Sequence, residues 1–297
     1  MQRAILAVVI SLLPAIAVEA STEPTAALIK LPSGVTLHYV VQGRPDGKPL
    51  VLLHGIGDSW HSYELVLPHI PDRYRVYAVS MRGHGWSDAP SSGYGHEDFA
   101  GDVTAFLEAL DLRKVTLVGH SLGSFVSQVV AARDSGRLDS LVLVGSGPGG
   151  APGVAAEARE IFATMAKDPK FARDFQASTI NKPVPAAFFE TMVRECAGAA
   201  PHMWAQAGGV AHNAGTVAGL ASITVPTLLI WGDRDSMLSR KDQDALLAAI
   251  KQSRLVVYNE TGHAPHWEEP TRFAKDLVSF AGQLLPREAG GTIPFNR

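Results

Sequence analysis

The chain has 297 residues, of which 46% are hydrophobic and 19% are charged, and its formal net charge is −3. This composition is typical of a soluble globular protein with enough apolar residues for a sizeable core. A near-neutral charge without a basic run gives no electrostatic reason to expect a nucleic acid partner, and we expect none. The only cysteine, Cys196, excludes a disulfide bond within the chain.

The first twenty residues differ in character from the rest. Arg3 precedes an apolar run over residues 4–18, and small residues follow it. This layout predicts a secretory signal peptide over residues 1–20, cleaved before Ser21. The run is shorter than the roughly 20 residues of a membrane-spanning helix and contains Pro14, so an uncleaved anchor is the less favoured alternative. We expect an exported protein, periplasmic or secreted, without a stable membrane anchor.

Strand-like and helix-like patterns then alternate along the chain. Apolar, β-branched runs predict strands at residues 26–31, 35–43, 49–55, 74–81, 115–118, 138–145, 224–232 and 254–260. The first two are expected to pair antiparallel across a Pro-Ser-Gly turn. Amphipathic spacing predicts helices at 96–110, after residue 121, at 239–250 and at 268–285. Strands alternating with helices predict an α/β protein with a mostly parallel sheet covered on both faces.

Between Pro148 and Ser222 this alternation stops. The segment is rich in alanine, is interrupted by prolines and glycines, and has helix-like stretches at residues 155–168 and 186–196. Strand patterns resume after it. We therefore predict a helical cap over residues 148–222, inserted into a core of residues 21–147 and 223–297 that ends in a short tail. A separate helical binding module is the alternative.

Residues 117–125, LVGHSLGSF, place Ser121 between two glycines in the pattern G-x-S-x-G. A buried strand precedes the pattern and a helix follows it, so the chain must turn within about three residues. Glycines on both sides permit such a turn, and the residue at its apex is held in a strained conformation with its side chain outward. The pattern predicts a nucleophilic serine; a plain strand-to-helix turn is the alternative.

A serine hydroxyl is a poor nucleophile unless a base takes its proton and a third group orients that base. Two loops that follow later strands supply such groups. IWGDRDS carries Asp233 and Asp235, and NETGHAPHWEEP carries His263 and His266. Because catalytic groups in open α/β sheets gather beyond the carboxyl ends of the strands, both loops are expected to converge on Ser121. The chain order is serine, acid, histidine.

With the motifs LLHGIGDS, SMRGHGWSD, GHSLG, LIWGDRDSM and GHAPHWEEP in this order, the mature chain resembles the serine-nucleophile α/β-hydrolases with a single helical cap. The resemblance implies an eight-stranded, mostly parallel sheet flanked by helices. It also implies that Ser121 is the nucleophile, Asp235 the acid and His263 the base. The oxyanion hole would be formed by the backbone N–H groups of Ile56 and Leu122.

One position departs from the family pattern. Relatives usually have an aspartate where this chain has Ser80, two residues before Arg82. Arg82 is expected to hold its loop through backbone carbonyls, and Asp102 is interpreted as a solvated charge. In the cap, Met203 and Trp204 are the predicted substrate contacts. Histidines in several glycine-flanked loops lack the spacing of a metal site, so we expect neither a metal nor a cofactor.

A serine at the turn argues against the haloalkane dehalogenase and epoxide hydrolase branches, which by resemblance use an aspartate there. The predicted reaction is hydrolysis of a carboxylic ester of a small molecule through an acyl-enzyme. Serine-dependent hydrolysis of a carbon–carbon bond, a lactone, a thioester or an amide remains an alternative. A non-catalytic binding protein on the same fold is the alternative from outside the enzymes. We expect a monomer or a homodimer.

Overall fold

The computed structural model describes residues 23–149, 160, 162–164, 168, 170–207 and 219–283. The predicted signal peptide, most of the helix expected at residues 155–168 and the tail from residue 284 lie outside these ranges.

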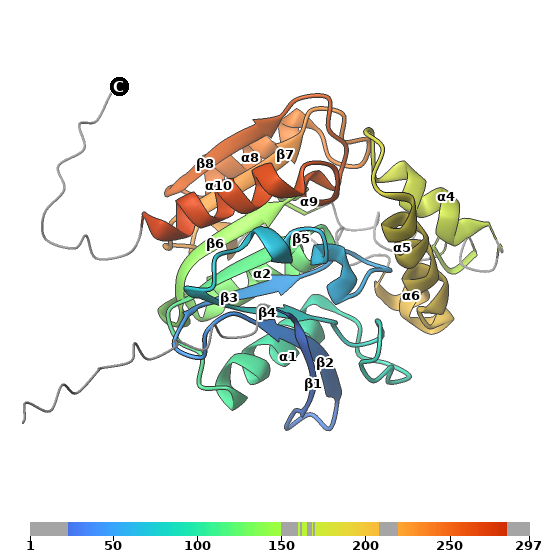
Figure 1. The fold of residues 1–297 in the computed structure, drawn as a ribbon, viewed down its shortest axis with the longest axis horizontal. Helices are drawn as coiled ribbons and strands as arrows, with labels where there is room; N and C mark the ends of the chain where they lie inside the picture. The colour runs from blue at the N-terminus through green and yellow to red at the C-terminus, as the bar shows by residue number, and fades with distance from the viewer. Residues whose placement is uncertain are drawn as a thin grey trace, which may run out of the picture.

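The described strands form one eight-stranded sheet in the order β1-β2-β4-β3-β5-β6-β7-β8 (Figure 1). β2 pairs antiparallel with β1 and with β4, and every other neighbouring pair is parallel. The expected mostly parallel sheet is confirmed. The strand bounds are β1 Thr25–Lys30, β2 Thr36–Gln42, β3 Lys48–Leu53, β4 Tyr74–Val79, β5 Val115–His120, β6 Leu138–Val144, β7 Thr227–Gly232 and β8 Ser253–Tyr258.

Two hydrophobic clusters fill the two faces of the sheet. Side chains of β3 alternate between them, with Leu50 and Leu52 in one cluster and Val51 and Leu53 in the other. Helices α1 (His96–Ala109), α2 (Leu122–Arg133) and α8 (Arg240–Ala249) cover the Val51 face. Helix α10 (Pro270–Gly282) and the short 3₁₀ helices η1 (Trp60–Tyr63) and η2 (Leu67–His69) cover the other face. A third 3₁₀ helix, η3, spans Ser135–Arg137.

The last predicted helix is divided in the structure. A short helix, α9 (Pro265–Glu268), ends before Glu269, and α10 begins at Pro270. Proline lacks a backbone N–H and is favoured in the first turn of a helix, so Pro270 starts a new helix instead of continuing the old one.

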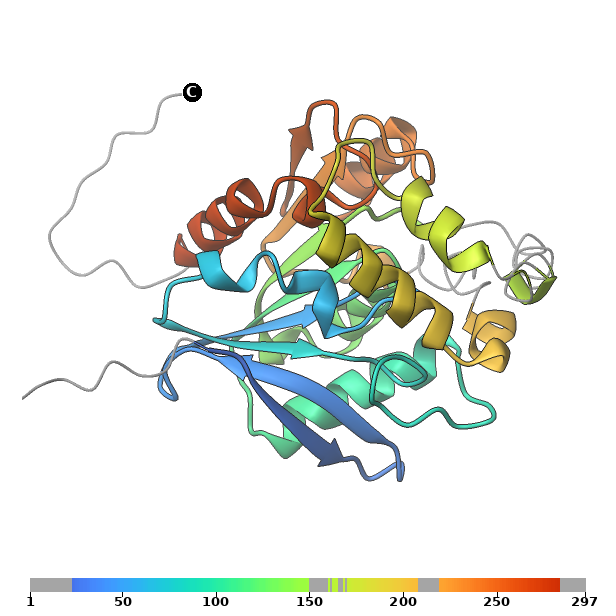
Figure 2. The same ribbon diagram turned by 45° about the vertical axis from the view of Figure 1, so that its right-hand side comes forward.

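Among the described residues between β6 and β7, the helices with defined bounds are α4 (Phe171–Ser178), α5 (Ala186–Gly198) and α6 (Pro201–Ala207). They fall within the predicted cap, residues 148–222, and no strand occurs among the described residues of that range. Figures 1 and 2 show them grouped on the side toward which β3 points. We call them the cap helices.

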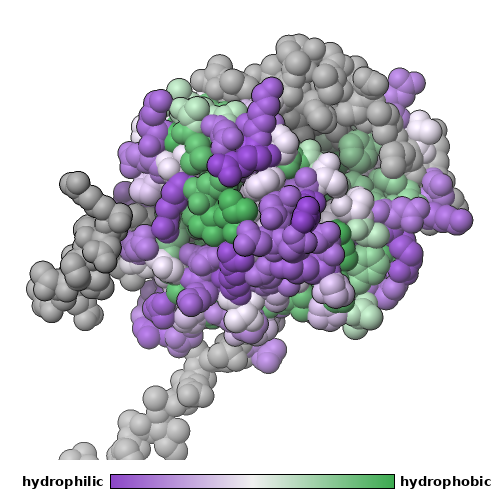
Figure 3. Space-filling model, turned by 90° about the horizontal axis from the view of Figure 1, so that it is seen from above, coloured by the Kyte–Doolittle hydropathy of each residue, from purple (hydrophilic) through white to green (hydrophobic). Residues whose placement is uncertain are grey.

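The described surface seen from above mixes hydrophilic and hydrophobic side chains (Figure 3). Over the whole described part, three large hydrophobic side chains are exposed: Leu28 in β1, Trp86 in the loop after β4, and Met237 in the loop after β7. No helix in the described ranges is long and apolar enough to cross a membrane.

Candidate active site

Ser121 stands between β5 and α2, at the apex of a sharp turn. Its backbone has φ 49° and ψ −117°, a conformation that residues other than glycine rarely adopt. A Cβ atom on Gly119 would lie 2.2 Å from the carbonyl oxygen of Gly123, and one on Gly123 would lie 2.5 Å from that of Leu53. Close backbone contacts therefore require both glycines, and the strained turn places the serine at the carboxyl edge of the sheet.

His263 and Asp235 form a buried pair from two neighbouring loops. Nδ1 of His263 lies 2.8 Å from Oδ2 of Asp235, and neither side chain is more than 2% exposed. The other carboxylate oxygen, Oδ1, accepts the backbone N–H groups of Met237 and Leu238 at 2.8 and 3.0 Å. The carboxylate accepts on both oxygens, so Nδ1 of His263 carries the proton and Nε2 keeps its lone pair.

No described hydrogen-bond donor occupies the lone pair on Nε2 of His263. Nε2 of His263 is buried and has no hydrogen-bond partner among the described residues, and the imidazole and Ser121 line the same cavity. These two residues are not hydrogen-bonded to each other in this structure. Such catalytic bonds often tighten only when substrate binds, so the arrangement suits a general base poised beside the serine.

The two aspartates of GDRDS differ in their surroundings. The side chain of Asp233, the residue directly after β7, is exposed and makes no hydrogen bond within the described residues, so its carboxylate does not shape the turn. Asp235 does this instead, because its Oδ1 binds two consecutive backbone N–H groups while its Oδ2 meets His263. One carboxylate therefore both forms the turn and orients the imidazole.

The backbone N–H groups of Ile56 and Leu122 border the same cavity. Leu122 is the first residue of α2, where N–H groups have no partner within the helix, and no described carbonyl accepts either N–H. The N–H of Gly123 donates to the carbonyl of His54 at 3.0 Å, which holds the loop of Ile56 against the start of α2. These two backbone donors without a protein acceptor are the ones that the predicted oxyanion hole would use.

His54 stiffens this loop from within. Its Nε2 accepts the backbone N–H of Met81 at 2.9 Å, and its Nδ1 lies 2.7 Å from the carbonyl oxygen of Gly55. Burial holds the pKa of His54 well below its usual value. The ring is therefore neutral and serves as a structural bridge between the loops after β3 and β4.

The cavity beside Ser121 has a volume of about 250 Å³ and mostly apolar walls. Its described lining residues are Ile56, Ser121, Leu122, Phe125, Phe162, Phe175, Ala207, Met237, Leu238 and His263. Met203 and Trp204, the predicted substrate contacts, do not line it. Both are buried, and Trp204 stacks behind the lining on Phe162, with ring centroids 5.6 Å apart.

Ser80 and Arg82 hold the loop after β4 in different ways. Ser80 Oγ accepts the backbone N–H of Trp60 at 3.2 Å. Arg82 donates to both carboxylate oxygens of Asp102 at 2.6 Å and also to the carbonyl of Gly93. The interpretation of Asp102 as a solvated charge is wrong, because this carboxylate is buried and paired. Neither Ser80 nor Arg82 lines the cavity beside Ser121.

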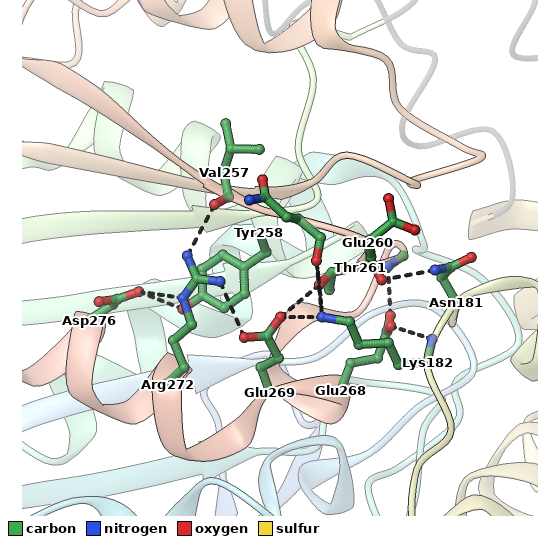
Figure 4. A network of polar contacts seen from close by, with 12 residues as sticks. Asn181, Lys182, Val257, Tyr258, Glu260, Thr261, Glu268, Glu269, Arg272 and Asp276 are labelled. Carbon is green, nitrogen blue, oxygen red and sulfur yellow. Dashed lines mark hydrogen bonds and ion pairs between the residues drawn. The ribbon is translucent and has the colours of Figure 1, made fainter.

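The loop that carries His263 is held to the cap by a polar network (Figure 4). Nζ of Lys182, from the loop between α4 and α5, donates to the carbonyl of Asn259, to Thr261 Oγ1 and to Glu269 Oε1 at 3.0, 3.0 and 2.6 Å. Asn181 adds a bond to the carbonyl of Glu260 at 2.8 Å. The cap is therefore tied to the histidine loop by side chains that do not line the cavity. Within the described ranges, no group of His, Cys, Asp or Glu is placed to bind a metal ion.

Comparison with known proteins agrees with this architecture. Residues 48–200 match the model of the alpha/beta hydrolase fold family. The structure is similar to an esterase from Exiguobacterium antarcticum, with TM-score 0.80 and 25% identity over 87% of this chain and 100% of that one. It is also similar to the esterase RhEst1 from a Rhodococcus species, with TM-score 0.78 and 29% identity over 87% of this chain and 99% of that one.

Among curated relatives, the chain is 26% identical to a 2-hydroxymuconate semialdehyde hydrolase from a Pseudomonas species, over 80% of this chain and 88% of the relative. The match to the family, the sheet order and the strained serine turn lead to one conclusion. The chain belongs to the alpha/beta hydrolase fold family.

Proposed function

We propose that the protein is a serine esterase that hydrolyses small, uncharged carboxylic esters through an acyl-enzyme on Ser121. One observation carries the proposal. The unpartnered Nε2 of His263, whose Nδ1 is bound by Asp235, opens on the same cavity as Ser121 and the two unused N–H groups of Ile56 and Leu122. These are the nucleophile, base and oxyanion donors that acyl transfer requires.

The reaction would proceed in two halves. Ser121 Oγ attacks the ester carbonyl carbon while its proton moves to Nε2 of His263, and the N–H groups of Ile56 and Leu122 bind the developing oxyanion. The intermediate collapses, and His263 gives the proton to the departing alcohol. Water then attacks the acyl-enzyme, again losing its proton to His263, and the carboxylic acid leaves with Ser121 restored.

The cavity lining supports an apolar substrate. Phe125, Phe162 and Phe175 supply aromatic walls, and His263 is the only titratable side chain among the described lining residues. A charged acyl group would lose its hydration there without gaining a partner. Aliphatic or aromatic acyl groups of modest size therefore fit best, and the two similar structures described as esterases support the same reaction class.

Export belongs to the same proposal. It rests on the charged, apolar and small-residue segments of residues 1–20. Mass spectrometry of the protein recovered from the cell envelope is expected to give an N-terminus at Ser21. Retention of residues 1–20 in the membrane fraction would contradict it.

The activity is tested with the mature chain and a panel of p-nitrophenyl esters of increasing acyl length. We expect turnover of short and medium acyl esters and its loss in Ser121→Ala. Carbon–carbon, lactone and thioester substrates belong in the same panel. Faster turnover of one of these, or ester turnover that survives in Ser121→Ala, would overturn the assignment.

A further inference from the structure

Behind the active site, Asp58 is a buried carboxyl with an unusual set of neighbours. It follows Ile56 in the loop after β3, and only 3% of its side chain is exposed. Oδ1 accepts from Nε2 of Gln176, in cap helix α4, at 3.0 Å. Oδ2 accepts from Ser62 Oγ at 3.4 Å and lies 3.9 Å from Nδ1 of His120. No lysine or arginine among the described residues pairs with this carboxyl.

The surroundings of His120 determine whether its Nδ1 carries a proton or a lone pair. Nε2 of His120 lies 3.0 Å from the carbonyl oxygen of His263, which can only accept, so Nε2 carries the ring proton. Burial keeps the pKa of His120 well below its usual value, so Nδ1 is unprotonated. Nδ1 is also buried and has no hydrogen-bond partner in the described part of the chain. A lone pair therefore faces the carboxyl of Asp58.

Two acceptors facing each other in a buried site repel unless a proton lies between them. The surroundings of Asp58 favour that proton. Burial raises its pKa to about 7, although the hydrogen bonds from Gln176, the Gly55 backbone and Ser62 work in the opposite direction. Gly55 leaves room for the approach, because a Cβ there would lie 2.9 Å from Nδ1 of His120 and 3.0 Å from Oδ2 of Asp58. A shift of about 1 Å brings the two atoms into hydrogen-bond range.

We propose that Asp58 is a positioning residue: at neutral pH its protonated carboxyl donates toward Nδ1 of His120. This contact ties the loop of Ile56 to the loop of His263. Gln176 joins the same carboxyl to the cap. The chain of contacts runs from Gln176 to Asp58, then His120, then the backbone carbonyl of His263. This inference rests on the proposed esterase function, because it concerns how the oxyanion donor and the base are held relative to each other.

Other titratable groups face Asp58 from neighbouring elements. Tyr63 of η1 and Cys196 of α5 interact with it, and burial raises the pKa of both side chains, so both stay neutral. His263 also interacts electrostatically with Asp58. Deprotonation of Asp58 places a carboxylate opposite the lone pair of His120, which loosens the link and lowers the turnover rate at alkaline pH.

The kinetic test compares Asp58→Asn with Asp58→Ala between about pH 6 and about pH 9. In wild type, kcat is expected to fall as Asp58 ionises. In Asp58→Asn the amide N–H₂ donates to His120 and the amide oxygen accepts from Gln176. We therefore expect kcat to stay within about threefold of wild type at neutral pH and not to fall at alkaline pH. In Asp58→Ala, kcat falls about tenfold or more while KM changes little.

Gln176→Met is a second variant for the same kinetic test. It removes one of the hydrogen bonds that favour the ionised carboxyl, at similar side-chain length, and is expected to move the alkaline decline to higher pH. Asp233→Asn, the same change at an exposed carboxylate, is the control, and its pH dependence of kcat is expected to match that of wild type. An unchanged alkaline decline in Asp58→Asn, or an unmoved one in Gln176→Met, would overturn the proposal.

Infrared difference spectra of wild type against Asp58→Asn measure the protonation of Asp58 directly, so they test this inference independently of esterase activity. A protonated carboxyl band is expected near pH 6 and lost by about pH 9, whether or not any ester is turned over. Absence of that band near pH 6 refutes the protonated pair. Failure of the esterase proposal would show itself elsewhere, as ester turnover that does not depend on Ser121.

Discussion

The backbone N–H of Gly262, the residue immediately before His263, donates to Oε1 of Glu268 at 2.7 Å. The second oxygen of the same carboxylate, Oε2, accepts the backbone N–H of Lys182 over 2.6 Å. Glu268 therefore holds the histidine loop and the loop between α4 and α5 at one point. Burial raises the pKa of Glu268 while both N–H groups favour its ionised form.

Glu268→Gln is expected to break one of these two bonds, because an amide has one accepting oxygen and its N–H₂ group opposes the second N–H. We expect a loss of about 1–3 kcal/mol in the free energy of unfolding and a lower kcat with little change in KM. Denaturant unfolding and steady-state kinetics measure both. Glu260→Gln, at an exposed carboxylate paired with Arg234, is the matched control. Equal effects of the two substitutions would count against a special role for Glu268.

Asp235→Asn is expected to lower kcat by about four powers of ten without unfolding the protein. If the amide oxygen keeps the backbone N–H groups of Met237 and Leu238, the N–H₂ group faces His263 and forces its proton onto Nε2. That tautomer cannot accept the proton of Ser121. Asp233→Asn is expected to change neither kcat nor the melting temperature, because its side chain is exposed and makes no hydrogen bond among the described residues. An inactive Asp233→Asn would show that the acid is misassigned.

Phe175→Ala is expected to shift substrate preference toward longer acyl chains. Phe175 lines the cavity from α4, and removing its ring lengthens the space available to the acyl group. The ratio of kcat/KM for long against short acyl esters is expected to rise about tenfold. Phe189→Ala, on the cap but outside the cavity lining, should leave that ratio unchanged. A shift of the same size in both variants would mean that the cap acts only through its overall stability.

The stability of the protein is expected to depend on pH through Asp58. An unfolded aspartate ionises near pH 3.8, whereas burial raises the folded-state pKa to about 7. Between these values the folded protein binds a proton that the unfolded chain has lost, so stability falls as pH rises through this window and levels off above it. Asp58→Asn removes this dependence and should gain up to a few kcal/mol relative to wild type between about pH 4 and about pH 8. A constant difference across that range would contradict the raised pKa.

The sheet and the reactive turn could be predicted from local patterns. Buried strands such as β5 are apolar throughout, and the glycines around Ser121 are required by contacts within a few ångströms of the turn. The loops of Asp235 and His263 could also be found, because both follow strands whose carboxyl ends meet at one edge of a parallel sheet. The resemblance to the family, and not this placement, distinguished these two residues from Asp233 and His266.

The cavity wall could not be predicted in the same way. Phe175 and Trp204 are both aromatic residues on short helices, and hydrophobic spacing predicts that both pack inward without showing which one lines the cavity. Phe125, which lines the cavity one helical turn after Ser121, was not predicted, although its spacing from Ser121 is a local signal for that position. The bond from Gln176 to Asp58 joins residues 118 positions apart, and only the folded arrangement of cap and core brings them together.

Ser121 is expected to carry the acyl group during turnover. Rapid acid quenching of the protein with excess p-nitrophenyl ester, followed by peptide mass spectrometry, measures this directly. We expect an acyl mass increment on the peptide that contains Ser121, absent from Ser121→Ala and lost with the same rate constant as that with which the acid product forms. An increment on another residue, or steady turnover with no increment on Ser121, would contradict it.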